Sequence, residues 1–244
     1  MQDSCHPETV ESHPDGLLKM VAVPSGRFAM GGMGDDKFVS EVELPSHEVE
    51  VEQGFLISEA PVTRGEWIEV MGSLPTGNLP DLGYDVPVVS VSFADAQAFC
   101  RGIGESYRLP TEAEWEFACR GGGGTIFPNG SNISTGEANY FYDELGFQVG
   151  EGRLMPVRSY GANGFGLYDA VGNVCEWTAD VWHAGYAGAP STATAWIVGG
   201  KRGHRVIRGG GWDHLPRVLR ASWRDWAPEA ARWDNLGFRV VKDY

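Results

Sequence analysis

Residues suited to binding and catalysis gather near the C-terminal end of the chain, between positions 212 and 235. This stretch combines four tryptophans with histidine, arginine and aspartate, and it lacks a regular hydrophobic period. Indole rings bind sugar rings, aromatic rings and cations, while charged side chains fix the orientation of a ligand. We therefore predict a ligand-binding cleft here, although any single tryptophan could instead pack in the core. The predicted lining residues are Trp212, Asp213, His214, Trp223, Arg224, Trp226, Trp233 and Asp234.

Three of these side chains are also the candidates for catalysis. Asp213 and His214 are adjacent, and a carboxylate beside an imidazole is suited to acid–base chemistry or to metal binding. Arg224 could orient a charged group of a substrate. A histidine in a loop more often has neither role, so a binding site without catalysis is the favoured interpretation.

A second candidate site is a glycine turn flanked by acidic residues. Asp169 and Glu176 lie on either side of Gly172. Two carboxylates together with loop carbonyls form the all-oxygen environment that Ca²⁺ prefers. The same spacing is compatible with ordinary turn chemistry, in which an aspartate stands near the start of the turn.

The composition is that of an acidic folded protein. Its 244 residues suffice for one filled core, and 33 Asp and Glu against 19 Lys and Arg give a formal net charge of −14. That charge disfavours nucleic acids and anionic membranes as partners. No run approaches the roughly 20 apolar residues of a membrane span, and no signal peptide is visible. We therefore expect no membrane span and a cytoplasmic location.

Local signals predict three helices in the first half of the chain. A hydroxyl residue three positions before an acid is the spacing of a capping box, which satisfies free N–H groups at a helix start. The pairs with this spacing are Thr63 with Glu66, Ser92 with Asp95, and Thr111 with Glu114.

Strands are predicted on both sides of these helices. Residues 20–32 are predicted to form a strand pair with a turn at Pro24-Ser-Gly, and the later strands are expected over 47–52, 55–58, 205–208 and 237–241. Residues 121–235 are rich in Gly, Asn, Asp and aromatic residues, which indicates a long, loop-rich second half. With no linker or repeat visible, we predict one domain over residues 19–243 after a flexible tail of residues 1–18.

Several segments occur in the order seen in one enzyme family. They are Met20-Val-Ala-Val-Pro-Ser-Gly-Arg-Phe, Pro61-Val-Thr, Arg108-Leu-Pro-Thr-Glu-Ala-Glu-Trp-Glu, Asn163-Gly-Phe-Gly-Leu-Tyr-Asp, Arg208-Gly-Gly and Leu236-Gly-Phe-Arg. Together they resemble the formylglycine-generating enzyme, or sulfatase-modifying factor, family over about residues 19–243. The resemblance implies an α+β fold, a variant of the C-type lectin fold. Such a fold has a small twisted antiparallel sheet, few helices and a long, loop-rich C-terminal half.

The same resemblance implies structural calcium as the cofactor. The ligands of a first site would be the side chains of Asp169 and Glu176 and the carbonyl groups of Gly172 and Val174. The ligands of a second site would include Asn139 and the carbonyl group of Tyr140, with the rest in the loop Asp143–Phe147. This loop matches the family poorly.

The residues that perform the chemistry of this family are absent. Family enzymes oxidise a substrate cysteine to formylglycine with copper held by two cysteines that follow an Arg-Gly-Gly-Ser stretch, and thiolates suit Cu(I). Here Gly211 stands at the serine position, and residues 212–224 contain no cysteine. We therefore expect no copper at this position and no formylglycine production.

The cysteines of the chain are scattered without the spacing of metal ligands. The resemblance places Cys100 and Cys119 at positions that form disulfides in some family members, with partners near Ala221 and Val240, and neither of these is a cysteine. We predict that Cys100 and Cys119 are unpaired thiols, as expected in a reducing compartment. The remaining two cysteines are Cys5 and Cys175.

The predicted function is a Ca²⁺-stabilised domain that binds a small molecule, glycan or peptide through the tryptophan-rich cleft. Some branches of the family that this chain resembles lack the copper-binding cysteines. These branches suggest two alternative functions. One is an oxidoreductase for a non-sulfatase substrate, for example in siderophore or natural-product maturation. The other is a retroelement-diversified binding protein. Variable positions in that branch derive from Asn codons, from which tryptophans such as Trp223 cannot arise, so Trp223 counts against it unless it is a fixed position.

Overall fold

The computed structural model describes residues 17–76 and 82–243, which contain three α-helices, ten strands and two 3-10 helices. The helices are α1 Arg64–Met71, α2 Phe93–Ile103 and α3 Glu112–Arg120, with η1 Glu41–Glu43 and η2 Pro216–Val218 as the 3-10 helices. The strands are β1 Met20–Val23, β2 Gly26–Met30, β3 His47–Val51, β4 Phe55–Ser58, β5 Tyr107–Arg108, β6 Cys175–Val181, β7 His204–Arg208, β8 Arg224–Pro228, β9 Leu236–Gly237 and β10 Val241–Lys242. Residues 1–16 of the predicted tail lie outside the described residues, and Leu18, its last residue, is buried in the core.

The three predicted helix starts are confirmed. Thr63, Ser92 and Thr111 each accept a hydrogen bond from the backbone N–H three residues later, and each receives the reciprocal acid of a capping box. Helices α1 and α3 end at Gly72 and Gly121, which adopt left-handed conformations with φ of 80° and 59°. A residue with a side chain would be strained at these positions, so the glycines end the helices.

The predicted strand pair at residues 20–32 is wrong in its pairing. Strand β1 pairs with β4, whereas β2 pairs with β3, so the Pro24-Ser-Gly segment carries the chain from one sheet to another. The predicted antiparallel sheet is divided into sheets of strand order β1-β4-β10-β5, β2-β3 and β8-β7-β6-β9. Among these pairs only β6 with β9 is parallel within the described residues. The predicted strand over 237–241 is split between β9 and β10, and each part joins a different sheet.

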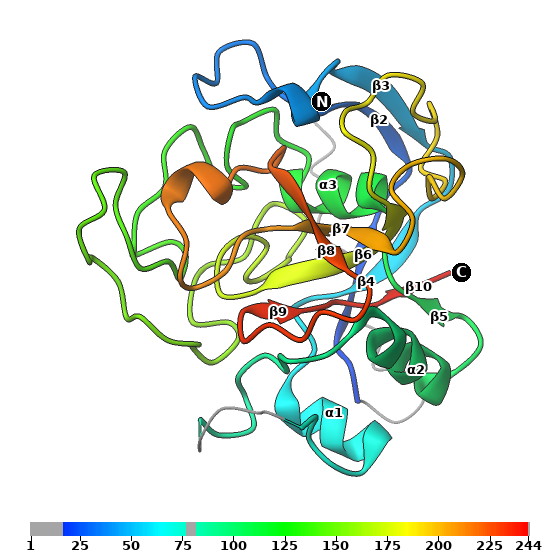
Figure 1. Cartoon of the computed structure of the whole chain (residues 1–244), viewed down its shortest axis with the longest axis vertical. Coiled ribbons are helices and arrows are strands. Elements are labelled where there is room, and N and C mark those ends of the chain that lie inside the picture. Colours follow the sequence, from blue (N-terminus) through cyan, green and yellow to red (C-terminus); the bar gives the residue numbers. More distant parts are fainter. Residues whose placement is uncertain (1–16, 77–81, 244) are drawn as a thin grey trace, which may run out of the picture.

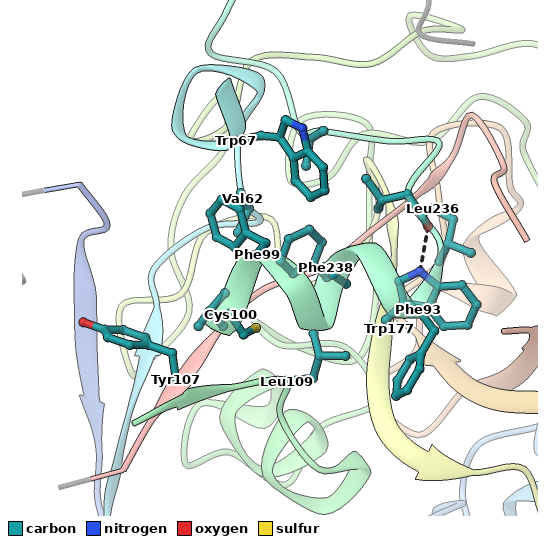
Figure 2. Close-up of a cluster of buried hydrophobic side chains, with 14 of the residues drawn as sticks. Val62, Trp67, Phe93, Phe99, Cys100, Tyr107, Leu109, Trp177, Leu236 and Phe238 are labelled. Carbon is teal, nitrogen blue, oxygen red and sulfur yellow. Dashed lines mark hydrogen bonds between the residues drawn. The ribbon is translucent and has the colours of Figure 1, made fainter. Parts of the chain in front are cut away.

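An aromatic core fixes the base of the C-terminal strands. The rings of Trp67 and Phe99 stack with 5.6 Å between their centroids, and Phe238 meets both edge-on. Figure 2 shows these rings beside α2, with Trp177 next to Phe93 at the right-hand end of the helix. The indole N–H of Trp177 donates to the carbonyl of Val91 at 3.0 Å. The connections between the C-terminal strands therefore start and end on a rigid platform.

Buried arginines hold the loop-rich second half in place. The guanidinium groups come from the last 40 or so residues of the chain, and each pairs with a carboxylate from an earlier segment. The pairs are Arg208 with Glu116, Arg220 with Glu43 and Asp36, Arg224 with Glu112, and Arg239 with Glu176. All four arginines are at most 2% exposed. Because a buried charge is costly without a partner, these pairs fix where each loop must lie.

Candidate functional site

The predicted tryptophan-rich cleft falls on β8 and on the two connections beside it, residues 209–223 between β7 and β8 and residues 229–235 between β8 and β9. Trp233 is 41% exposed, so its indole lies on the surface. Trp212 is half-buried against a small apolar cluster, and its indole N–H donates to the carbonyl of Asp234 at 3.3 Å. Trp223 packs against the main core. The four tryptophans therefore divide between surface and core.

Trp226 lies on β8, and its ring is already in contact with other side chains. The ammonium group of Lys201 is 3.6 Å from the ring centroid, and the ring of His204 meets it edge-on at 4.6 Å. This is a cation–π contact within the protein. A ligand that stacked on Trp226 would have to displace Lys201.

Arg224 does not line a cleft, and the prediction for this residue is wrong. It is 2% exposed, and its Nε and Nη2 atoms donate to the two carboxylate oxygens of Glu112 at 2.6 and 2.9 Å. Its guanidinium also stacks over the rings of Trp182 and Tyr186. The contact with Glu112 ties β8 to α3, so Arg224 is a structural residue rather than a ligand or catalytic group.

Asp213 and His214 come together with two residues that the cleft prediction did not include. The Nδ1 atom of His214 accepts the backbone N–H of Gly211 at 2.9 Å and lies 4.0 Å from the Cys175 thiol. The carboxylate of Asp213 accepts the Asn235 amide at 2.8 Å. Asn235 opens the Leu-Gly-Phe-Arg segment and Cys175 begins β6, so both were visible only as parts of sequence motifs.

The hydrogen bond from Gly211 determines the state of the histidine. Because Nδ1 is an acceptor, the neutral ring carries its proton on Nε2, which lies 4.0 Å from an oxygen of Asp213. Burial lowers the pKa of His214 and outweighs the opposite effect of Asp213, so the ring is neutral near pH 7. Burial also raises the pKa of Cys175 well above its ordinary value. The pair therefore offers a neutral N–H donor at the surface rather than a thiolate nucleophile.

Gly211, at the position of the serine of the family, is closely packed. A Cβ atom built on it would lie 3.0 Å from Cβ of Asn235 and 3.2 Å from a carboxylate oxygen of Asp213. The two preceding glycines have φ of 89° for Gly209 and 70° for Gly210, which residues with side chains rarely adopt. The space next to Gly211 that a serine side chain would need is thus largely taken by neighbouring side chains.

The first predicted calcium site does not have free oxygen ligands on Glu176. Both carboxylate oxygens of Glu176 accept from Arg239 at 2.7 and 2.8 Å, and one also accepts the indole N–H of Trp115. Arg239 also donates to the carbonyl of Asp169 at 3.0 Å. The carboxylate of Asp169 is buried, and burial raises its pKa to about 6. Since the guanidinium already occupies the space between these groups, Glu176 does not fit a calcium ligand in this arrangement.

The second predicted site contains a buried oxygen without a partner. The amide nitrogen of Asn139 donates to the carbonyl of Arg153 at 2.9 Å and to Oδ1 of Asn173 at 3.0 Å. These two acceptors fix the orientation of the amide, and Oδ1 of Asn139 is left buried with no partner among the described residues. A hard cation would satisfy that oxygen. Asn139 therefore fits the chemistry of a calcium ligand.

The described part of the chain contains no further cluster of side chains suited to holding a metal ion. Over residues 17–76 and 82–243, no group of three or more His, Cys, Asp or Glu is placed to hold a metal ion. Cys100, Cys119 and Cys175 are buried and free, which confirms the predicted unpaired thiols, while Cys5 lies outside the described residues. No helix within those ranges is long and apolar enough to cross a bilayer.

Comparison with known proteins identifies similar chains along the whole sequence. Residues 6–244 match the sulfatase-modifying factor enzyme 1-like domain. The chain is 34% identical to the formylglycine-generating enzyme of Bos taurus, over 95% of this chain and 76% of that enzyme. It is 32% identical to the serine/threonine-protein kinase Pkn1 of Chlamydia trachomatis, where the match covers 97% of this chain but 40% of the kinase.

The structural comparison supports the same fold. The structure of PvdO from Pseudomonas aeruginosa superposes with a TM-score of 0.83 at 32% identity, covering 99% of this chain and all of that one. This chain itself has three helices, mostly antiparallel sheets and long connections within the described residues. The fold is therefore α+β, the C-type-lectin-like variant that the sequence motifs predict.

Proposed function

Because the chain belongs to the sulfatase-modifying factor family, whose domain it matches over residues 6–244, we propose that it is a binding member of that family. It makes no formylglycine and takes a small molecule, glycan or peptide at a surface that we call the Trp233 face. This face consists of Trp212, Asp213, His214, Trp233 and Asn235. The observation that carries the proposal is the packing around Gly211, where Asn235 and Asp213 occupy the space of a serine side chain.

The groups on this face are arranged for recognition. The neutral His214 ring offers an N–H donor, and the Asp213 carboxylate, 36% exposed, offers acceptor oxygens. Asn235 is buried beneath these groups, where its amide donates to the Asp213 carboxylate at 2.8 Å and holds it in place. Hydroxyl and amide groups both donate and accept hydrogen bonds, so they match this set. The exposed indole of Trp233 supplies an apolar surface for a ring or an aliphatic chain.

The binding proposal is tested by screening the purified chain on glycan and peptide arrays, with Trp233→Ala as the main variant. Val198→Ala is the matched control, because Val198 is 79% exposed and lies outside the face. We expect a saturable ligand whose affinity falls at least tenfold in Trp233→Ala and His214→Ala but not in Val198→Ala. Equal loss in all three variants, or no loss in any, would contradict the proposal.

We also propose that calcium stabilises the domain at Asn139 and the Tyr140 carbonyl. The support is the buried Oδ1 of Asn139, whose orientation is fixed by its two donor contacts. Bound there, calcium would supply only charge and coordination to the loop that follows. That loop lies next to the Trp233 face, because Tyr142 donates its N–H to the carbonyl of His214 and Glu144 pairs with Arg217.

The alternative is an oxidoreductase acting on a non-sulfatase substrate at the same face. One observation favours it, the 4.0 Å approach of the Cys175 thiol to the His214 ring, since this pair combines two groups used in redox and metal sites. Retention of a redox metal by the purified chain, or oxygen consumption with a candidate substrate, would support the enzyme over the binding domain. The variant Cys175→Ser further distinguishes the two proposed functions. It should leave ligand binding unchanged, whereas it should abolish an activity that depends on the thiol.

A further inference from the structure

A cavity of about 930 Å³ lies apart from the Trp233 face. It is bounded by α2, β5, the end of β6 and residues 193–197, and none of the predicted cleft residues lines it. In Figure 1, α2 and β5 lie toward the lower right, whereas the connection that carries η2 runs along the left side. The volume falls within the range of about 300–1,000 Å³ that is typical of small-molecule sites.

One face of α2 forms a long wall of this cavity. Phe93, Gln97, Cys100 and Arg101 all line it, and their spacing of four, seven and eight residues places them on one side of a helix. From Phe93 to Arg101 the helix rises about 12 Å. The lining also includes the apolar residues Val181 and Ile197, and Ile197 is 60% exposed. The cavity is therefore elongated, with an apolar side that lacks a cover.

The acidic groups in the wall are already neutralised. Arg108 pairs with Glu114 and with Asp243, each at 2.6 Å. Glu114 also accepts the backbone N–H of Thr111 at 2.8 Å, as the acid of the α3 capping box. These carboxylates have little remaining capacity to attract a cationic ligand.

The guanidinium groups, in contrast, keep free donors. Arg205 lies over the ring of Phe93, with Nε on Glu229 at 2.8 Å and Nη1 on the carbonyl of Ala179 at 2.7 Å. Its Nη2 atom and the whole guanidinium of Arg101 have no partner within the described ranges. The one lining carboxylate left unpaired in those ranges is Glu52, which is exposed in the turn between β3 and β4. The α2 side thus presents N–H donors and positive charge.

We propose that this cavity binds an elongated small molecule with an apolar body and one anionic group, which Arg101 holds. The anionic group is a carboxylate, sulfonate or phosphate, since all three supply acceptor oxygens to a guanidinium. The apolar body lies along α2 and covers Ile197. This site is independent of the Trp233 face, so either can be wrong without affecting the other.

Two matched fluorescent probes test the proposal. Anilinonaphthalene sulfonate has an apolar body and an anionic group, whereas N-phenylnaphthylamine has nearly the same body without the charge. Both are titrated into the folded wild-type chain and four variants. Arg101→Gln removes the anion anchor, and Arg202→Gln removes an exposed arginine outside the cavity. Ile197→Asp alters the apolar side, and Val198→Asp makes the same change at the neighbouring residue, which is 79% exposed and does not line the cavity.

The expected results separate the anion anchor from the apolar side. Arg101→Gln weakens the sulfonate probe about fivefold, as expected for one partly exposed charge contact, and leaves the neutral probe unchanged. Ile197→Asp weakens both probes at least fivefold, while Arg202→Gln and Val198→Asp change neither. Thermal melts of the variants within a few degrees of wild type exclude unfolding as the cause. Absence of saturable sulfonate-probe binding, or equal effects of Arg101→Gln and Arg202→Gln, would overturn the proposal.

Discussion

Replacing Arg220 by methionine removes the charge that holds two buried carboxylates together. In the native chain, Nη1 of Arg220 lies 2.7 Å from Asp36 and 2.8 Å from Glu43, and Nη2 lies 2.8 Å from the other oxygen of Glu43. The three side chains are at most 3% exposed. This cluster ties the segment around η1 to the connection before β8. Methionine fills a similar volume, so the change acts mainly through charge.

The expected cost follows from the burial of these groups. At an effective dielectric of about 20, two charges about 4 Å apart attract by about 4 kcal/mol, which offsets a desolvation cost of several kcal/mol for each ion. Without Arg220, the two carboxylates still carry the desolvation cost of burial but no longer gain the attraction to the guanidinium group. We expect the free energy of unfolding to fall by about 3–5 kcal/mol near neutral pH.

The pH dependence gives a second, independent test. Burial raises the pKa of Glu43, but the hydrogen bonds and charge of Arg220 outweigh burial, so the native pKa lies below its ordinary value. Glu43 therefore stabilises the native chain above its unfolded pKa, and this stabilisation is lost as pH falls through the native pKa. In the variant only the hydrogen bonds from Ser222 and Ser40 still oppose burial, so the pKa of Glu43 rises and the penalty is relieved as the carboxyl takes up a proton. The difference between the two chains should shrink as pH falls.

Urea unfolding followed by tryptophan fluorescence measures both effects. Arg217→Met is the matched control, because Arg217 pairs with Glu144 on the surface, where its side chain is 43% exposed, and such a pair contributes about 0–1 kcal/mol. Adding Glu43→Gln to Arg220→Met should recover part of the loss, since one buried charge is then removed. The reasoning is refuted if Arg220→Met costs no more than Arg217→Met, or if the difference grows as pH falls.

Three further predictions concern the site and the helices. Gly211→Ser should displace Asn235 and lower the free energy of unfolding by about 1–3 kcal/mol. This variant should still produce no aldehyde from a Cys-X-Pro-X-Arg peptide with copper, as mass spectrometry would show. Calcium at 100 times its Kd should stabilise the chain by about 2.7 kcal/mol in thermal melts. Asn139→Ala should abolish that gain, whereas Glu176→Gln should lower the Tm with or without calcium; an unchanged wild-type melt in chelator would contradict this. Thr63→Ala should cost about 1 kcal/mol in urea unfolding by loss of a helix cap, and a change below the error of the measurement would count against the cap.

Features that depend on neighbouring residues in the chain are predictable from the sequence. The capping boxes at Thr63, Ser92 and Thr111 need only a hydroxyl and an acid three residues apart, and the structure forms all three. The ends of α1 and α3 at Gly72 and Gly121 likewise depend on one backbone conformation. Strand pairing, in contrast, depends on residues that are far apart in the sequence. The Pro24-Ser-Gly segment resembles a hairpin turn, but β1 and β2 have better partners in β4 and β3.

Arg224 shows why the candidate site was less predictable. In the sequence it stands between Trp223 and Asp225, which is typical of a charged residue in a binding loop. In the structure its guanidinium reaches Glu112, 112 positions earlier, and the carbonyl of Val42, 182 positions earlier. No local pattern indicates which distant segment will cover a side chain. The same reason applies to Glu176, whose spacing suits a metal ligand and whose carboxylate is held by Arg239, 63 positions later.

The residues that hold the turn before position 211 make contacts that do not depend on that position, where the family resemblance implies a serine. Arg208 is needed for its buried contacts with Glu116 and with backbone carbonyls, and Gly209 and Gly210 are needed for their left-handed conformations. None of these requirements involves the side chain at position 211. Once that position is glycine, Asn235 and Asp213 can pack into the space, and the adjacent His214 accepts the backbone N–H of Gly211. The turn then presents a neutral imidazole and acceptor oxygens where the family places a serine, so function has to be argued from these groups rather than from the fold.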